Sequence, residues 1–366
     1  MKVMTILGTR PEIIRLSIII SKLDKVCEHV LVHTGQNYTE SLNDIFFRQL
    51  KLRSPNHSLG IKSPSFGDQI GKIISQSEIL MVKEKPDKLL ILGDTNSGLS
   101  AVPAKRMGIP VYHMEAGNRC YDDRVPEEVN RRIIDHSSDV LMPYTYRSKE
   151  NLVQEGIARE NIFVTGNPIF EVLQYYSGKI KASKIFQELK LQKGKYFLVT
   201  MHRSENVDVI ERLKNFIIAL ESLAGLYKIP IILSLHPRTK NKMDKFGISF
   251  KNSLIKLITP LGFFDFIALE KKALCVISDS GTVQEECCIF KVPNITIRDV
   301  TERPETIECG SNIISGNNPD QIISNVNYVI SKKCLWEPPP EYIENNVSDK
   351  IINILVGNVS LSFRRP

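Results

Sequence analysis

Short apolar runs, polar or glycine-containing turns and longer amphipathic stretches follow one another along most of the chain. Short apolar runs bounded by turns are typical of buried strands, and longer stretches with helical periodicity are typical of helices that cover a sheet. In the first half the predicted strands are 3–7, 30–33, 89–92, 111–114, 140–143 and 162–165. The helices predicted between them are 12–23, 69–83, 96–107 and 127–136.

The second half repeats this pattern. Its predicted strands are 197–200, 231–234, 255–259, 275–278 and 294–297, and its predicted helices are 209–223, 264–272, 283–290 and 321–331. Strands that alternate with helices indicate parallel sheets covered on both faces. We therefore predict an α/β fold with two Rossmann-like domains, 1–168 and 169–345, that face one another across a cleft. The tail 346–366 carries one more apolar segment and is expected to pack back on the first domain.

Composition narrows the class of protein. With 366 residues, 42% hydrophobic and 24% charged, the chain resembles a soluble globular protein. It has neither an apolar run long enough for a membrane span nor the core of a signal peptide, so we expect a cytoplasmic protein without a membrane partner. Its seven cysteines are scattered and show no metal-ligand spacing, so no metal site is predicted. Adjacent Cys287 and Cys288 are interpreted as small buried residues on a helix.

The formal charge of +7 favours an anionic partner. Lys and Arg are spread along the chain without a basic block, so nucleic acid is not expected as a partner. A small di- or tri-anionic molecule fits the charge equally well.

Ligands of open α/β sheets bind beyond the carboxyl ends of the strands, so the turns after the predicted strands are the candidate sites. The first strand is followed by Gly8-Thr9-Arg10-Pro11-Glu12. A phosphate at this turn would contact N–H groups of a helix N-terminus and the Arg10 guanidinium. An ordinary strand-to-helix turn explains the same residues equally well.

Three acids follow strands of the first half or open the next helix. Asp94 follows the third strand, Glu115 follows the fourth, and Glu127 lies in the first turn of a helix. Singly, each has a structural explanation, as a helix cap or a first-turn acid. Together they would repel one another at one edge of a sheet, and this cost favours a catalytic role. Glu115 comes directly after an apolar run, and partial burial tends to raise the pKa of a carboxyl group.

The turns of the second half carry complementary groups. His202 and His236 follow its first two strands, and Ser280-Gly281-Thr282 opens a helix after its fourth. N–H groups and hydroxyls at a helix N-terminus form a phosphate cradle, to which Arg303 would add a cation. One half would therefore offer carboxylates and the other would hold a nucleotide diphosphate.

These residues resemble the non-hydrolysing UDP-N-acetylglucosamine 2-epimerase family. The similar motifs run in family order over residues 5 to about 310 and are Gly8-Thr9-Arg10-Pro11-Glu12, Gly93-Asp94-Thr95, Glu115-Ala116-Gly117, Pro126-Glu127-Glu128-x-Asn130-Arg131, His202-Arg203, Asp279-Ser280-Gly281 and Arg298-Asp299-x-Thr301-Glu302-Arg303-Pro304-Glu305.

The resemblance implies a two-domain GT-B fold, usually a homodimer, with a UDP-sugar as substrate and with neither an organic cofactor nor a metal. It implies that the catalytic set is Asp94, Glu115, Glu127 and His202. It implies that the UDP-sugar is bound by Arg10, Arg15, His236, Phe266, Ser280, Gly281, Thr282, Glu286 and Arg303, with Phe266 packed against uracil.

This sequence departs from the family pattern at three places. Arg15 stands where Lys is usual, which keeps the charge but replaces a compact ammonium by a planar fork. Residues 34–38 lack the Gln-His-Arg signature tied to allosteric activation in bacterial homologues, so such regulation is not expected. The loop 117–126 is shorter than usual and differs in composition.

That loop resembles a branch of capsule and O-antigen enzymes that convert UDP-2-acetamido-2,6-dideoxy-L-talose to UDP-N-acetyl-L-fucosamine. We favour this substrate over the UDP-N-acetylglucosamine/UDP-N-acetylmannosamine pair. The expected mechanism is elimination and re-addition of UDP through a glycal, with proton transfer at carbon 2. The alternatives are a GT-B glycosyltransferase, which needs an acceptor, a hydrolysing epimerase, which releases UDP, and a nucleotide-sugar sensor without catalysis.

Overall fold

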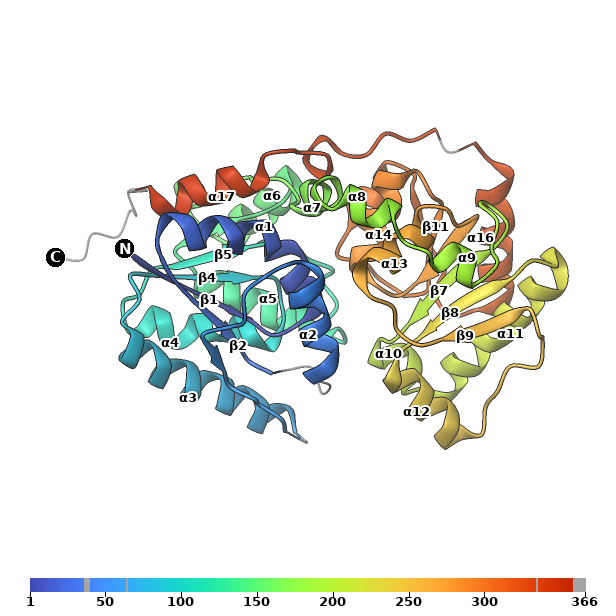
Figure 1. Ribbon diagram of the computed structural model, residues 1–366, viewed down its shortest axis with the longest axis horizontal. Coiled ribbons are helices and arrows are strands. Elements are labelled where there is room, and N and C mark those ends of the chain that lie inside the picture. The colour runs from blue at the N-terminus through green and yellow to red at the C-terminus, as the bar shows by residue number, and fades with distance from the viewer. Residues whose placement is uncertain (36–39, 64, 334, 358–366) are drawn as a thin grey trace. The chain divides into compact units, whose positions relative to one another are not determined.

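The structure, a computed structural model, describes residues 1–35, 40–63, 65–333 and 335–357 (Figure 1). It divides into two compact units: Met1–Gln174 with Pro340–Pro366 is called the first unit, and Tyr175–Pro339 the second. The sequence placed these boundaries at 168 and 345. The first unit extends to Gln174 and so includes most of helix α7 (Ile169–Tyr175), whose Glu171 accepts the N–H of Ser348 in the same unit at 2.8 Å.

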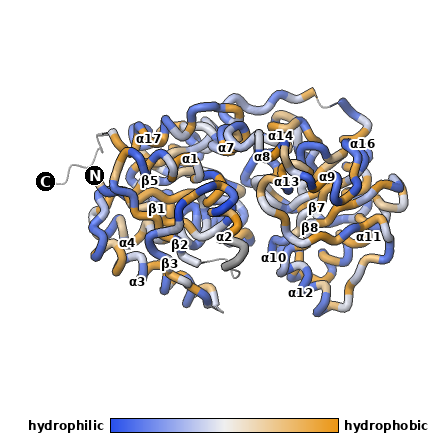
Figure 2. The backbone as a smooth tube through the Cα atoms, in the orientation of Figure 1, coloured by the Kyte–Doolittle hydropathy of each residue, from blue (hydrophilic) through white to orange (hydrophobic). Residues whose placement is uncertain are grey.

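The first unit is built on a six-stranded parallel sheet in the order β3-β2-β1-β4-β5-β6. The strands are β1 (Lys2–Leu7), β2 (Glu28–His33), β3 (His57–Ser58), β4 (Lys88–Leu92), β5 (Val111–Met114) and β6 (Val140–Met142). Apart from β3 they are mostly buried, which explains why they read as continuous apolar runs. Figure 2 shows the hydrophobic character of β1.

Helices cover both faces of this sheet. They are α1 (Arg10–Val26), α2 (Glu40–Gln49), α3 (Phe66–Glu84), α4 (Ala101–Arg106), α5 (Pro126–His136), α6 (Tyr146–Gln154), α7 and α17 (Val347–Val356), with 3₁₀ turns η1 (Asn96–Ser100), η2 (Arg159–Asn161) and η3 (Pro340–Tyr342). Helix α17 packs against α1, and α3 packs against α4, on opposite faces (Figure 1). The Lys22 ammonium fixes the first of these contacts by donating to Ser348 Oγ at 2.7 Å.

The second unit is built on another six-stranded parallel sheet, in the order β12-β11-β10-β7-β8-β9. The strands are β7 (Phe197–Met201), β8 (Ile231–Leu235), β9 (Ile255–Ile258), β10 (Cys275–Ser278), β11 (Asn294–Thr296) and β12 (Asn312–Ile314). Alternate residues of β7, β8 and β10 form one hydrophobic core with α11 and α16, and α13 and α14 carry buried residues of their own.

The helices of the second unit are α8 (Ser177–Lys181), α9 (Ile185–Glu188), α10 (Ser204–Val207), α11 (Ile210–Tyr227), α12 (Pro237–Phe246), α13 (Phe263–Glu270), α14 (Gly281–Phe290), α15 (Pro304–Glu308) and α16 (Pro319–Ser331). None of the helices in the described part of the chain is long and apolar enough to cross a membrane.

The two sheets have the same topology, and this topology positions the polar turns. In each sheet the first strand of the unit pairs with the second strand on one side and with the fourth on the other. Ligands of doubly wound sheets bind where the strand order reverses in this way. In the first unit the reversal lies between β1 and β4, and in the second between β7 and β10.

Two predicted elements differ from the structure. Residues 162–165 do not form a named strand, because pairing with β6 is limited to one bridge between Leu141 and Ile162. Residues 96–107 are not one helix but η1 followed by α4. Pro103 has no N–H group and so fits only the first turn of an α-helix. The short strands β3 and β12 were not predicted.

Candidate active site

The turns after β1 and β4 meet at the strand reversal of the first unit. Helix α1 begins at Arg10, and the side chain of Glu12 accepts the N–H groups of Gly8 and Thr9 at 3.1 and 2.7 Å. Thr95, which follows β4, donates to the other oxygen of Glu12 at 3.2 Å. Burial raises the pKa of the Glu12 carboxyl group to about 7, although these hydrogen bonds oppose it. Glu12 is therefore the residue that joins the two turns.

Arg10 lies at the start of α1, where the sequence predicted a phosphate contact. Its guanidinium carbon lies 5.9 Å from the ring centroid of Phe46. Burial lowers the pKa of this guanidinium, and the side chain remains partly exposed. Arg10 thus presents a cation beside a helix N-terminus.

Glu115 follows β5 in a strained backbone conformation. Its φ is +64°, a left-handed value that is uncommon for a residue other than glycine. The carboxylate is only 7% exposed and is held by three donors: Arg15 at 2.5 Å, Tyr144 at 3.1 Å and Asn118 at 3.3 Å. A buried acid held so firmly is presented at one fixed position.

Arg15, the departure from the family pattern, is the counter-ion of Glu115. Both side chains are almost fully buried, and the guanidinium carbon also lies 5.6 Å from the ring centroid of Tyr144. An adjacent cation favours the charged form of a carboxylate and opposes the effect of burial. The sequence indicated the burial of Glu115 but not its pairing with Arg15.

Asp94 is held by a second arginine. Arg131, on α5, donates from Nε to one carboxylate oxygen of Asp94 at 2.9 Å, and its Nη2 lies 2.6 Å from the same oxygen as an ion pair. Arg131 also pairs with buried Glu128 at 2.7 Å. Glu127 precedes Glu128 in the first turn of α5 and is half-buried. Glu115 and Asp94 are thus each paired with an arginine, and Glu127 lies on the helix that carries one of these arginines.

Asp94 and Glu115 come from adjacent turns. A Cβ atom built on Gly93 would lie 3.7 Å from Oε2 of Glu115, so the Glu115 carboxylate lies against the residue that precedes Asp94. The structure therefore brings together the acids of β4 and β5, as the parallel sheet requires.

A buried His–Asp pair connects the turns after β4 and β5. The ring of His113, on β5, lies 2.9 Å from the carbonyl oxygen of Gly93 and 2.8 Å from Asp135 of α5. Asp135 also accepts the N–H of Gly117 at 3.2 Å and pairs with Arg119 at 2.8 Å. Burial opposes its ionisation, but His113 and Arg119 lower the pKa of Asp135. Sequence reasoning missed this pair because nothing in the sequence links residue 113 to residue 135.

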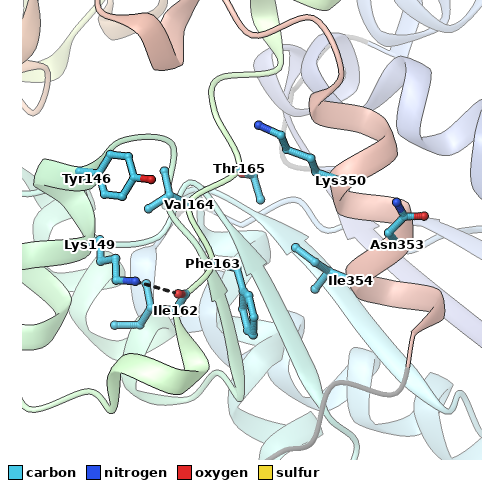
Figure 3. A pocket seen from close by; sticks show the side chains of 9 residues that line it. All are labelled: Tyr146, Lys149, Ile162, Phe163, Val164, Thr165, Lys350, Asn353 and Ile354. Carbon is cyan, nitrogen blue, oxygen red and sulfur yellow. Dashed lines mark hydrogen bonds between the residues drawn. The ribbon is translucent and has the colours of Figure 1, made fainter.

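A pocket elsewhere in the first unit is separate from these acids. It has a volume of about 470 Å³ and is lined by α6, the segment 162–165 and α17, with Tyr146, Lys149 and Lys350 among the lining residues (Figure 3). None of the predicted site residues lines it. We therefore place the chemistry at the strand reversal and not in this pocket.

In the second unit, His202 and Asp279 follow the two strands at the reversal. The Asp279 carboxylate accepts the N–H groups of His202 and Arg203 at 3.0 and 2.9 Å and lies 3.0 Å from Nδ1 of His202. Burial opposes its ionisation, but the charge of His202 and these donors hold the pKa of Asp279 far below its ordinary value. Asp279 orients the His202 ring through its contact with Nδ1, and this leaves Nε2 for a ligand. The side chain is 37% exposed.

His236 lies beside His202. The two ring centroids are 5.7 Å apart, and His236 caps α12 by accepting the N–H of Arg238 at 3.2 Å. Two predicted site residues, one after β7 and one after β8, thus form one cluster.

The turn predicted as an anion cradle lies at the N-terminus of α14. Ser280 is the N-cap residue, and its hydroxyl lies 3.0 Å from that of Thr282. A Cβ atom on Gly281 would lie 2.6 Å from Oε1 of Glu302, so a larger residue would have to displace this buried carboxylate. The hydroxyls and N–H groups of this helix end can bind an anion.

Arg303 and Glu286 lie deeper in the same region. Arg303 donates to Glu285 of α14 at 2.5 Å, and Glu285 is fully buried. Burial, followed by the charge of Glu286, raises the pKa of Glu270 well above its ordinary value. Glu286 is therefore next to a carboxyl group whose pKa is raised. Phe266, the remaining predicted residue, is half-buried on α13.

Several site neighbours were in quoted motifs but received no role from the sequence. Glu302 accepts from Arg298 at 2.8 Å, and both are almost fully buried. The spacing Arg298-x-x-x-Glu302 could have indicated this ion pair, because it joins residues i and i+4. Tyr144 and Asn118 carried no signal. Within the described residues, no group of three or more His, Cys, Asp or Glu side chains could hold a metal ion.

The chain has two doubly wound units. One holds arginine-paired carboxylates at the strand reversal, and the other has a helix N-terminus there that can bind an anion. This combination is typical of a GT-B-like nucleotide-sugar enzyme. The family model described as UDP-N-acetylglucosamine 2-epimerase matches residues 21–356, and the chain belongs to this family. The members of this family are isomerases that act on UDP-sugars.

Named relatives agree with this assignment. The UDP-N-acetylglucosamine 2-epimerase of Methanocaldococcus jannaschii is 43% identical over 97% of this chain and 99% of its own length. The UDP-2,3-diacetamido-2,3-dideoxy-D-glucuronate 2-epimerase of Pseudomonas aeruginosa is 34% identical over 91% of this chain and 93% of its own. A crystal structure of the M. jannaschii enzyme with UDP-GlcNAc and UDP superposes with a TM-score of 0.93, 41% identity and coverage of 97% and 99%.

Proposed function

We propose that this chain inverts carbon 2 of a UDP-linked 2-acetamido sugar without hydrolysing it, by elimination and re-addition of UDP through a glycal. Membership of the family makes the chain a UDP-sugar 2-epimerase. The observation that carries the mechanism is the buried Arg15–Glu115 pair beside Gly93-Asp94. It holds a carboxylate that is only 7% exposed at a fixed place beside a cation.

The chemistry requires both a base and a place for UDP. The hydrogen on carbon 2 of an acetamido sugar is not acidic, because no carbonyl group activates it directly. Departure of UDP from carbon 1 develops positive charge there and makes that hydrogen removable. Cations and N–H donors stabilise the departing diphosphate, which is the role we propose for Arg10, His236, Arg303 and the Ser280–Thr282 cradle. The proposal requires both units to act on the same substrate molecule.

Carboxylates perform the proton transfer. A general base must be ionised, and the arginine partners of Glu115 and Asp94 favour that form. Inversion needs proton acceptors or donors on both faces of the sugar ring, which is consistent with a catalytic set of Asp94, Glu115 and Glu127. His202, oriented by Asp279, would contact a phosphate or carry a proton.

The experiment follows the proton. Incubation of the chain with a UDP-2-acetamido sugar in heavy water should give an epimer with deuterium at carbon 2. Glu115→Gln should lose most turnover and keep UDP affinity, because the cradle is in the other unit. Glu150→Gln, on an exposed ion pair of the same unit, is the matched control and should turn over normally. An unlabelled epimer would exclude proton exchange, and UDP release equal to turnover would indicate hydrolysis instead.

Two sugars compete as the natural substrate. The UDP-N-acetylglucosamine/UDP-N-acetylmannosamine pair is supported by the names of the archaeal relatives, which are 43% and 40% identical. UDP-2-acetamido-2,6-dideoxy-L-talose is supported by the short loop 117–126, and with it a capsule or O-antigen pathway. Both versions include the homodimer that the family resemblance implies. Separate incubation with the D-gluco and 6-deoxy-L-talo substrates decides between them by the ratio of kcat/KM values.

A further inference from the structure

Two thiols face one another at the carboxyl ends of two helices in the second unit. Cys288 lies near the end of α14, and Cys309 is the residue that follows α15. Their sulfur atoms are 3.6 Å apart, and both are free thiols. The pair is independent of the residues assigned to catalysis.

The two thiols have different surroundings. Cys288 is fully buried, and its carbonyl oxygen accepts the indole N–H of Trp336 at 3.1 Å. Cys309 is only half-buried, and its sulfur lies 3.4 Å from the hydroxyl of Ser311. A reachable thiol backed by a buried one is the arrangement of a reacting and a resolving cysteine.

The hydrogen bonds of the pair favour the thiolate on the accessible member. The hydrogen bond from Cys288 lowers the pKa of the Cys309 thiol to about 6, with a further contribution from Ser311. The same bond raises the pKa of Cys288. The thiolate is the nucleophilic form of cysteine, so Cys309 is the member that attacks an oxidant.

We propose that Cys288 and Cys309 are an oxidisable dithiol that forms a disulfide when the chain meets hydrogen peroxide. The Cys309 thiolate attacks one peroxide oxygen, which gives a sulfenic acid and releases hydroxide. The Cys288 thiol then loses its proton and attacks the sulfenic sulfur, which forms the S–S bond and expels the second oxygen as hydroxide. Two protons from the thiols convert both hydroxides to water. Two thiols lose two electrons, and one peroxide becomes two waters.

The geometry favours this pair over the other thiols. Forming the bond brings the sulfur atoms from 3.6 Å to about 2.05 Å. The neighbouring Cys287 is directed elsewhere, because its thiol donates to Glu270 at 3.6 Å. Cys334 lies outside the described residues and is therefore treated as a competitor in the experiment.

The disulfide would act on the cradle of the proposed function. Helix α14 begins at Gly281 and α15 begins directly after Arg303, so the bond would join the far ends of two helices whose near ends carry site residues. The N-terminus of α14 is closely packed, since Gly281 lies against the side chain of Glu302. Oxidation is therefore expected to change the affinity of the second unit for UDP.

The test treats the full chain with a small excess of hydrogen peroxide and maps its peptides by mass spectrometry. The expected product is a Cys288–Cys309 linked peptide that dithiothreitol removes. Cys309→Ser should abolish the linked peptide, and Cys27→Ser, a half-buried thiol of the first unit, should leave it unchanged. Cys288→Ser, which keeps Cys309 and a hydrogen-bond donor beside it, should instead give a sulfenic acid that dimedone traps.

Other outcomes overturn the proposal. They are a Cys309–Cys334 link, oxidation of Cys309 to sulfinic acid in the wild type without any link, or thiols that stay reduced while Cys27 reacts. UDP affinity, measured by calorimetry, should change by at least about fivefold on oxidation and recover with dithiothreitol. An unchanged affinity with the disulfide formed would overturn the link to the cradle. UDP that fails to bind the reduced chain would contradict the proposed function, while peptide mapping would still decide the dithiol.

Discussion

Replacing Arg15 by methionine is expected to destabilise the first unit by about 3 kcal/mol. Arg15 is 3% exposed and its partner Glu115 is 7% exposed, so the substitution leaves a buried carboxylate without its cation. Tyr144 and Asn118 still donate to Glu115, which keeps the cost at the lower end of the range for breaking a buried ion pair. Arg15→Lys, the usual family residue, should cost only about 1 kcal/mol through loss of the planar fork and its contact with the Tyr144 ring.

The assay is urea unfolding at pH 7, followed by far-UV circular dichroism. The chain has one tryptophan, Trp336, which lies in the second unit, so its fluorescence serves as the control transition. The double variant Arg15→Met/Glu115→Gln should recover about 2 kcal/mol, because it also removes the buried charge that Arg15 balanced. The reasoning is refuted if Arg15→Met lies within about 0.5 kcal/mol of the wild type, or if the double variant is no more stable than Arg15→Met.

Gly281→Ala should weaken UDP binding at least about tenfold in calorimetry, because its Cβ atom would lie 2.6 Å from a buried carboxylate oxygen; Gly225→Ala, with open space around it, is the control and should bind normally. The pKa of Asp279 is depressed in the folded state, so its contribution to stability is present above its ordinary pKa of about 4 and is lost as pH falls below it. The free energy of unfolding in urea, measured between about pH 5 and pH 2, should fall more steeply for the wild type than for Asp279→Asn. Parallel curves would contradict this. Asp135→Asn should cost about 3 kcal/mol in the same assay, since Asp135 is fully buried and paired; a cost below about 1 kcal/mol would show that the pairing contributes little.

The sequence predicted the fold class because both sheets are buried on two faces and their strands are therefore almost wholly apolar. It missed β3, which has only two residues, and β12, whose apolar run is limited to Ile313 and Ile314. It predicted a strand at 162–165 because apolar residues at an edge resemble a strand, although their pairing stops after one bridge.

The candidate site was predictable only in part. Turns after strands can be located from sequence, and Asp94, Glu115, His202 and Ser280 lie where parallel sheets place them. The partners of these residues cannot be located in the same way. Tyr144, for example, follows β6 and reaches Glu115 across the sheet edge at 3.1 Å, a contact between positions that share no motif.

The discontinuity of the first unit has a consequence for biosynthesis. Helix α17 buries Val347, Ile351 and Leu355 in this unit, yet all of the second unit is translated before it. During translation the face of α1 that receives α17 therefore stays open to solvent and to chaperones, while the second unit can already fold. A chain that ends after Pro339 would lack α17, so the core of its first unit would stay partly exposed. Such fragments should be strong substrates for quality-control proteases.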